Sequence, residues 1–284
     1  MSQGSMTDQQ AQGECPAMSR DEQYEQQEQR LRAQSALIRH KILVMSGKGG
    51  VGKSTLATNL AWSLAGRGHQ TGLLDADING PSIPLMVGLQ DRVGTGTVGF
   101  EPVQVLPNLG VLSIAFFLNS PDTPTIWRGP LKGGVIRQFV ADVEWGPLDY
   151  LVIDLPPGTG DEPLTVAQMF PDADGGVIVT TPQEASLSVC RKAVNFLHSV
   201  KLPCLGIVEN MSGFVCPHCG QATDVFARGG GEQMAKKMRV PFLGRVPLSA
   251  EIVSRADQGL PLVGADAPAA VREAIEGIAV LLGE

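Results

Sequence analysis

The chain has 284 residues, of which 43% are apolar and 18% charged, and its formal net charge at pH 7 is −7. Such a composition is typical of a globular chain with one large core. The acidic balance argues against a nucleic acid or an anionic membrane surface as the main partner. The sequence has no apolar run long enough to cross a bilayer and starts with a polar, Gln-rich stretch. We therefore expect a cytoplasmic protein.

Residues 1–38 differ in composition from the rest of the chain. The stretch 21–30 is polar on every face, so it is either a solvated helix or disordered, and disorder is the favoured interpretation. We expect residues 1–38 to form a disordered tail and residues 39–284 to form one domain.

Apolar strand patterns alternate with helical patterns from Lys41 onward. The expected strands lie at 42–45, 71–75, 150–154, 177–180 and 205–208, with two more within 103–117. The expected helices lie at 54–65, 132–143, 186–200, 231–238, 249–258 and 267–282. Fully apolar strands suit a sheet that is buried on both faces. The sequence therefore predicts an α/β class with a doubly wound, mostly parallel sheet and helices on both faces.

A phosphate-binding loop connects the first strand to the first helix of this domain. Residues 47–54 read Gly-Lys-Gly-Gly-Val-Gly-Lys-Ser, and this pattern between a strand and a helix is typical of P-loop nucleotide-binding proteins. Glycines let backbone N–H groups approach phosphate oxygens, and the helix N-terminus favours negative charge. Lys53 is expected to reach the β- and γ-phosphates, and the Ser54 hydroxyl to bind Mg²⁺. The nucleotide-binding residues expected here are Gly47, Lys48, Gly49, Gly50, Val51, Gly52, Lys53, Ser54 and Thr55.

Three aspartates end strands that we expect to lie beside this loop. Asp154 follows an apolar strand and is the expected carboxylate for Mg²⁺, acting through water. The segment 156–160 that follows it contains two glycines and is interpreted as a switch. Asp75 and Asp77 follow the second strand, and a carboxylate there can orient the attacking water. Asp77 is the first choice and Asp75 the second; ordinary turn-forming aspartates are the alternative.

Several of these motifs resemble those of one known family. The early Lys48 resembles the deviant Walker A motif of the class that includes MinD, ParA and the nitrogenase reductase. Four further segments resemble the Mrp/ApbC family of iron–sulfur cluster carrier ATPases over about residues 40–282. They are Asp75 to Ser82, Asp154 to Asp161, Val208 to Ser212, and the pair Cys216 and Cys219 in Cys-Pro-His-Cys.

The resemblance implies more than the residues show by themselves. It implies a homodimer with two nucleotides near the interface, in which Lys48 reaches the phosphates of the partner subunit and stabilises developing charge. It also implies that Asn210 reads the adenine and that residues around Pro247 close that pocket. Relatives with an N-terminal ferredoxin-like set of cysteines differ from this chain, which has only Cys15 before the loop. Cys15 is interpreted as an incidental thiol.

Cys216 and Cys219 have the spacing of two metal ligands on one loop. An iron–sulfur cluster is the favoured cargo, with zinc or a redox pair as alternatives. Because a [4Fe–4S] cluster takes four thiolates and one chain offers two at this spacing, we expect the cluster to bridge a symmetric dimer. Cys190 and Cys204 fall in a helix and a strand and are expected in the core.

The function expected from the sequence is an ATP-hydrolysing iron–sulfur cluster carrier. Its cofactors would be ATP, Mg²⁺ and a [4Fe–4S] cluster, and its partners apo iron–sulfur proteins and an assembly scaffold, without nucleic acid or membrane. Two other classes remain open: a spatial-organisation ATPase like MinD or ParA, and a reductase resembling the nitrogenase iron protein. The C-terminal helix pattern is acidic on its polar side, which disfavours MinD-like membrane binding.

Overall fold

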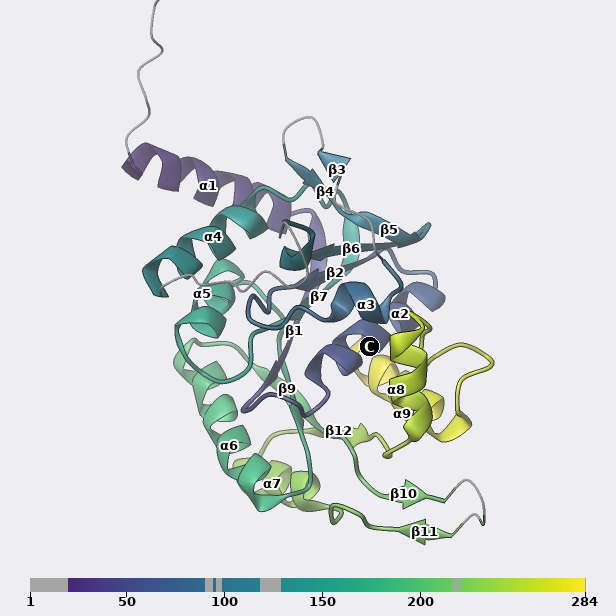
Figure 1. Cartoon of the computed structure of the whole chain (residues 1–284). Coiled ribbons are helices and arrows are strands. Elements are labelled where there is room, and N and C mark those ends of the chain that lie inside the picture. Colours follow the sequence, from purple (N-terminus) through teal and green to yellow (C-terminus); the bar gives the residue numbers. More distant parts are fainter. Residues whose placement is uncertain are drawn as a thin grey trace, which may run out of the picture.

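An eight-stranded sheet forms the centre of the protein (Figure 1). The computed structural model describes residues 20–89, 94–95, 99–117, 129–216, 219 and 221–283. The strand order is β12-β9-β8-β1-β7-β2-β6-β5, and only the β5–β6 pair at one edge is antiparallel. The strands are β1 (Ile38–Ser46), β2 (Thr71–Asp75), β5 (Val103–Leu106), β6 (Leu109–Ser113), β7 (Leu148–Asp154), β8 (Gly175–Thr180), β9 (Cys204–Glu209) and β12 (Phe242–Arg245).

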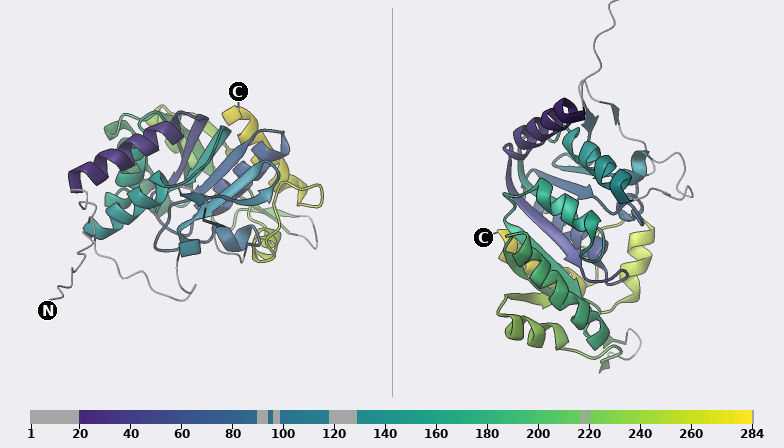
Figure 2. Two further views of the ribbon diagram at one scale, coloured as in Figure 1. Left: turned by 90° about the horizontal axis from the view of Figure 1, so that it is seen from above. Right: turned by 90° about the vertical axis from the view of Figure 1, so that its left-hand side faces the viewer.

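Helices cover both faces of this sheet (Figure 2). One face packs against α1 (Arg20–Ser35), α4 (Gly129–Ala141), α5 (Asp161–Met169), α6 (Glu184–Ser199) and α7 (Gly230–Met238). The other packs against α2 (Lys53–Gly66), α3 (Ile83–Met86), α8 (Ala250–Asp257) and α9 (Ala269–Gly283).

The central strand shows why two faces need two sets of helices. In β1, Leu43 and Met45 join the first core, while Ile42 and Val44 join the second. All four are buried, because successive side chains of a strand point to opposite faces and each face is covered. The predicted doubly wound α/β class is confirmed.

The N-terminal segment differs from its prediction. Arg20–Ser35 form helix α1, where disorder was the favoured expectation, and residues 1–19 lie outside the described part. Leu31 is buried against the first core, and Arg30 Nη1 lies 3.1 Å from Asp142 Oδ1. The helix is polar on most of its surface, so its sequence carries almost no periodic signal. A few tertiary contacts hold it in place. The division of the chain at residue 38 stays a prediction.

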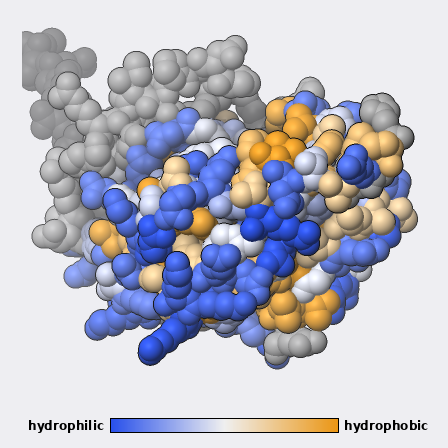
Figure 3. Space-filling view, turned by 90° about the horizontal axis from the view of Figure 1, so that it is seen from below, coloured by the Kyte–Doolittle hydropathy of each residue, from blue (hydrophilic) through white to orange (hydrophobic). Residues whose placement is uncertain are grey.

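The remaining strands form two small hairpins beside the sheet. β3 (Gly94–Thr95) pairs with β4 (Phe100–Glu101), and β10 (Phe214–Val215) pairs with β11 (Ala222–Thr223). The second hairpin follows β9 and extends away from the body of the molecule (Figure 1). Seen from below, the protein surface is largely hydrophilic with separate apolar patches (Figure 3), as for most soluble domains.

The end of the 103–117 segment also differs from its prediction. The second strand stops at Ser113, and a 3-10 helix (η1, Ile114–Phe117) follows. This stop leaves Ser113 beside Asp75, the last residue of β2, in the parallel register. Three neighbouring strands, β1, β7 and β2, thus bring their carboxyl ends to one edge, where ligands bind in such folds.

Candidate nucleotide site and cysteine loop

The predicted phosphate loop lies between β1 and α2, and Gly47, Gly50 and Gly52 have a backbone conformation or close packing that favours glycine. Gly50 and Gly52 have φ angles of 76° and 87°, in the left-handed region that favours glycine. A Cβ atom on Gly47 would lie 2.6 Å from the backbone carbonyl carbon of Val189, and one on Gly52 would lie 2.1 Å from Asn210 Nδ2. No side chain fits at these two positions, so the loop backbone packs directly against its neighbours.

Lys53, the first residue of α2, reaches back to the end of β7. Its Nζ lies 2.6 Å from Asp154 Oδ1 and 3.8 Å from Asp77 Oδ2, and it donates a 3.4 Å hydrogen bond to Ser54 Oγ. Lys53 and Asp154 are both buried. A buried ion pair of this kind holds its charges because each compensates the other. The structure therefore brings together Lys53, Ser54, Asp77 and Asp154, as the sequence predicts.

Asp154 has an oxygen that none of these contacts uses. Its Oδ2 atom is buried and has no hydrogen-bond partner among the described residues. Burial raises the pKa of Asp154, and the neighbouring Lys53 ammonium opposes that rise. An unused carboxylate oxygen beside the Ser54 hydroxyl is a donor set that suits Mg²⁺. The residues present therefore fit the predicted metal ion.

Asp75 and Asp77 occupy different environments although they are two residues apart. Asp75 is fully buried; its Oδ2 accepts a 2.9 Å hydrogen bond from Ser113 Oγ, and its Oδ1 accepts one of 3.2 Å from the backbone of Asp77. Burial, followed by the charge of Asp154, raises the pKa of Asp75 to about 7. Asp77 instead lines the cleft beside the loop. Asp75 does not line this cleft, and Asp77 also makes the turn contacts of the alternative interpretation: its Oδ1 accepts hydrogen bonds of 3.2 Å and 3.3 Å from the backbone N of Asn79 and Gly80.

A cleft of about 390 Å³ lies in front of the phosphate loop. Asn210 and Pro247, the residues expected around the adenine, line it together with loop residues. Asn210 Nδ2 donates a 2.8 Å hydrogen bond to the carbonyl of Val51, which ties the end of β9 to the loop. The full lining is Ser46, Gly49, Gly50, Gly52, Lys53, Ser54, Thr55, Asp77, Gly80, Ser82, Met86, Pro157, Asn210, Met211, Pro247, Leu248, Ser249, Ile252 and Val253.

Two parts of this cleft differ from the sequence expectation. Gly47, Lys48 and Val51, which were expected among the nucleotide-binding residues, do not line it. Lys48 is half-buried at the start of the loop, and its carbonyl accepts a 2.9 Å hydrogen bond from Ser46 Oγ. Conversely, Ile252 and Val253 of α8 line the cleft and were not predicted as site residues. One signal in the sequence could have located them. Ser249, two residues after Pro247, is a typical N-cap residue, and in the structure its Oγ accepts a hydrogen bond from Glu251 N at the start of α8.

The cysteine pair lies on the tip of the β10–β11 hairpin. Cys216 is half-buried, its backbone N donates a 3.0 Å hydrogen bond to the carbonyl of Gln221, and Cys219 is exposed. His218, which lies between the two cysteines in the sequence, falls outside the described residues. Within the described part, no three His, Cys, Asp or Glu side chains gather closely enough to hold a metal ion. The described residues of this hairpin offer two thiols, those of Cys216 and Cys219.

Cys190 and Cys204 are separate from this hairpin. Cys190 is buried in the first core, and Cys204 is half-buried and packs against it. Burial raises the pKa of Cys190 to about 12 and that of Cys204 to about 11. Both thiols therefore stay protonated at neutral pH, as expected for small core residues.

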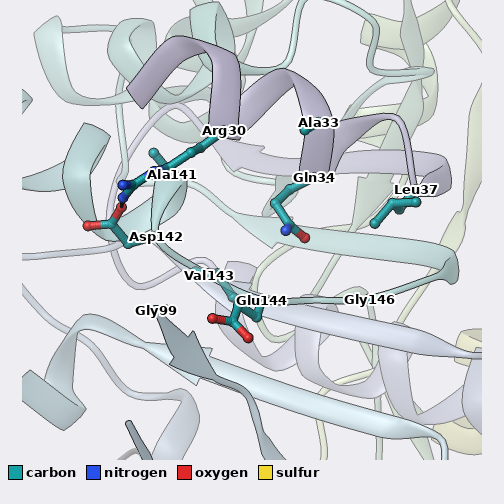
Figure 4. A pocket seen from close by; sticks show the side chains of 10 residues that line it. All are labelled: Arg30, Ala33, Gln34, Leu37, Gly99, Ala141, Asp142, Val143, Glu144 and Gly146. Atoms are coloured by element: carbon teal, nitrogen blue, oxygen red, sulfur yellow. Dashed lines mark hydrogen bonds and ion pairs between the residues drawn. The ribbon is translucent and has the colours of Figure 1, made fainter. Parts of the chain in front are cut away.

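A second cavity, of about 500 Å³, lies at the opposite edge of the sheet (Figure 4). Its lining includes Leu37, which directly precedes β1, and Gly146, which lies two residues before β7, so it opens at the amino ends of these strands. Arg30 points toward Asp142 and is paired with it (Figure 4). The cavity forms where α1 crosses this edge, and it has no contact with the phosphate loop.

The comparison with protein families is consistent with this geometry. The model of a family described as ParA, NUBPL iron-transfer P-loop NTPase, matches residues 37–282. This chain belongs to that family. The match confirms the resemblance inferred from the motifs.

Two relatives show how close the family likeness is. An iron-sulfur cluster carrier protein of Methanocaldococcus jannaschii is 49% identical over 245 residues, which cover 86% of this chain and 84% of that protein. A protein of Nematostella vectensis named cytosolic Fe-S cluster assembly factor NUBP2 homolog is 50% identical over 227 residues, covering 78% of this chain and 84% of that protein.

Solved structures agree on the fold of this NUBPL-type chain. A nucleotide-binding protein from Archaeoglobus fulgidus, solved in complex with ADP, is 42% identical with a TM-score of 0.72, covering 82% of this chain and 91% of that one. The cell division ATPase MinD of Pyrococcus furiosus shares the fold with a TM-score of 0.63 at 23% identity, covering 85% and 97%. Among the described residues, no helix is both long and apolar enough to span a membrane.

Proposed function

We propose that this protein is an ATP-hydrolysing carrier that holds an iron–sulfur cluster as cargo between two copies of the chain and passes it to apoproteins. The observation that carries the proposal is that the nucleotide cleft and the cysteine hairpin both adjoin the end of β9. β9 ends beside the nucleotide cleft, and the hairpin with Cys216 and Cys219 follows directly from it. The names of the relatives from Methanocaldococcus jannaschii and Nematostella vectensis, which refer to iron–sulfur clusters, support this choice of cargo.

Several residues in and beside the cleft have a role in the proposed hydrolysis. Lys53 would leave Asp154 for the β- and γ-phosphates, and the loop N–H groups would surround the phosphate oxygens. Ser54 and Asp154 would hold Mg²⁺, which when bound neutralises charge on the phosphate oxygens. Asp77 would orient the attacking water. Asn210 and Pro247 would contact the adenine, with Ile252 and Val253 closing the apolar side.

Lys48 would act on the other copy of the chain. It is half-buried and does not line its own cleft, which suits an action on a nucleotide held by a partner. A positive charge supplied to developing negative charge lowers the barrier of phosphoryl transfer. In a symmetric dimer, the same arrangement occurs twice.

The cargo site would also form between two copies. One chain presents one exposed and one half-exposed thiol on a projecting hairpin, and two such hairpins would supply the four thiolates of a [4Fe–4S] cluster. A cluster held at the surface is easily given up to an apo iron–sulfur client or taken from an assembly scaffold. The net charge of −7 leaves nucleic acid and anionic membranes as unfavourable partners.

A transfer experiment tests this function. The protein is reconstituted anaerobically with iron and sulfide, separated from free iron, and mixed with an apo-ferredoxin, whose visible absorption reports cluster arrival. Wild-type protein should convert the acceptor, and Cys216→Ser/Cys219→Ser should not. If both proteins convert the acceptor equally, the cargo role is wrong. If reconstituted protein instead reduces an electron acceptor without losing its cluster, a reductase is the better description.

A further inference from the structure

Glu209 is a buried carboxylate that the proposed hydrolysis does not use. It is the last residue of β9, its exposed fraction is 0%, and it pairs in register with Thr180 of β8 on one side and Arg245 of β12 on the other. A carboxylate at this depth needs hydrogen-bond donors or positive charge to be stable. The hydrogen-bond donors of Glu209 show which segments of the chain this carboxylate connects.

Three of these donors come from the two ends of the cysteine segment, residues 212–231. Glu209 Oε1 accepts hydrogen bonds of 2.5 Å from Ser212 Oγ and 2.9 Å from the backbone of Gly229, and Oε2 accepts one of 2.5 Å from the backbone of Gly231. Ser212 precedes β10, while Gly229 and Gly231 follow β11. One side chain therefore closes the base of the hairpin that presents Cys216 and Cys219.

The glycines after β11 are shaped for this contact. Gly229 has a φ of 87°, and a Cβ on Gly231 would lie 3.0 Å from Glu209 Oε2. Because Gly229 caps α7 and Gly231 lies in its first turn, the Glu209 carboxylate also serves as the capping group of this helix. Negative charge at a helix N-terminus is stabilising.

Among the described residues, Arg245 is the cation that pairs with this carboxylate. Its Nε lies 3.6 Å from Glu209 Oε1, and its guanidinium pairs with Glu232 in the first turn of α7. Glu232 therefore shares Arg245 with Glu209, but its own hydrogen bonds within the described chain join it to Lys236 and Arg245 and not to Ser212, Gly229 or Gly231. This difference makes Glu232 a matched control.

Glu209 is also adjacent to the nucleotide cleft. The next residue, Asn210, donates its side-chain amide to the carbonyl of Val51 and its backbone N–H to the carbonyl of Thr180. After it, the backbone N of Ser212 bonds to Val246, and Leu248, which lines the cleft, bonds to Gly213. The cleft wall and the hairpin base thus share one short stretch of backbone.

We propose that Glu209 is a positioning residue that fixes the cysteine hairpin to the nucleotide cleft, so that a change at the phosphate loop is passed through Asn210 to the spacing of Cys216 and Cys219. The inference rests on the proposed function for the use of that spacing, and its test does not depend on iron. A ligand can shift the hairpin only if it interacts differently with two arrangements of this backbone.

The test compares Glu209→Gln with Glu232→Gln in metal-free protein. Amide exchange of peptides covering 225–232 is measured by mass spectrometry, with and without Mg-ADP, together with the labelling rate of Cys219 by N-ethylmaleimide. Removing the charge from a buried acceptor weakens its hydrogen bonds, so Glu209→Gln should speed exchange at Gly229 and Gly231 by roughly ten- to a hundredfold. Mg-ADP should change Cys219 labelling in wild type and in Glu232→Gln, and leave it unchanged in Glu209→Gln, whose Mg-ADP affinity is retained.

Two results would overturn the proposal. One is a Glu209→Gln protein with wild-type exchange at the hairpin base. The other is a nucleotide effect on Cys219 labelling that survives in Glu209→Gln or is lost equally in Glu232→Gln. If Glu209→Gln does not fold, Glu209→Asp keeps the charge beside Arg245 but is one methylene too short to hold both ends, and the same readouts apply. Failure of the wild type to bind iron would contradict the proposed function and leave these readouts unaffected.

Discussion

Lys53 Nζ lies 2.6 Å from Asp154 Oδ1, and both side chains are almost fully buried. The lysine expected to bind phosphate therefore forms an ion pair with the carboxylate expected to hold Mg²⁺. Because a buried charge needs a partner, any nucleotide that draws Lys53 away must itself supply compensation for Asp154. Mg²⁺ bound together with the phosphate would supply this positive charge. Metal binding and the movement of Lys53 would therefore occur together.

This pairing leads to a first prediction about Lys53→Ala. The variant should lose ATP hydrolysis, since removing one contact to transition-state charge typically lowers turnover by about 10²–10³-fold. It should still fold, because the pKa of Asp154 is already raised by burial and the carboxyl can be neutral once the ammonium is gone. Phosphate release and circular dichroism of the purified variant measure the two effects. Wild-type turnover would remove Lys53 from the phosphate site.

The second prediction separates Asp77 from Asp75. Asp77→Asn should lower turnover by about 10²-fold or more, because the carboxylate that orients water is lost. Asp75→Asn, the matched control, keeps the shape of a residue that lies beneath the cleft and bonds to Ser113, so most of the activity should remain. Steady-state hydrolysis at saturating Mg-ATP compares them. A larger loss in Asp75→Asn would reverse the two roles.

The third prediction concerns Lys48. Lys48→Ala should reduce turnover while nucleotide affinity stays close to that of the wild type, because the ammonium acts on the partner's nucleotide in the transition state. Affinity for a fluorescent ATP analogue and turnover are measured separately. An equal loss of affinity and rate would mean that Lys48 binds the nucleotide of its own subunit.

The fourth prediction concerns thiol reactivity in metal-free protein. Cys219 is exposed and should be alkylated readily at pH 8, whereas burial raises the pKa of Cys190 to about 12 and keeps it protonated. Peptide mass spectrometry after timed iodoacetamide treatment should find Cys219 modified while Cys190 is modified only after denaturation. Early modification of Cys190 would contradict its placement in the core.

Much of this site could be predicted from the sequence because strand ends carry strong signals. The apolar runs that end at Met45, Asp75 and Asp154 belong to strands buried on both faces, and parallel strands bring their carboxyl ends to one edge. The prediction for Asp154 depends on that rule, and the predictions for Lys53 and Ser54 depend on the loop motif between a strand and a helix. The distances between these side chains depend on packing, which no pattern encodes.

The ordering of helix α1 and the contacts of Glu209 could not be predicted from the sequence. The residues that hold α1, such as Leu31 and Arg30, are isolated in a polar stretch, and their partners lie far along the chain. Glu209 is an acidic residue at the end of an apolar strand, and its donors Gly229 and Gly231 follow the hairpin. Its depth and its capping role emerge only when the hairpin folds back onto β9.

The central claim is that two copies of the chain share one cluster through Cys216 and Cys219. The most direct measurement is iron and sulfide per dimer after anaerobic reconstitution, with the dimer isolated by size-exclusion chromatography, for wild type and Cys216→Ser/Cys219→Ser. The account predicts about four irons per wild-type dimer and almost none in the double variant. Iron retained by the double variant, or zinc filling the wild-type site after iron loading at one ion per two chains, would contradict it.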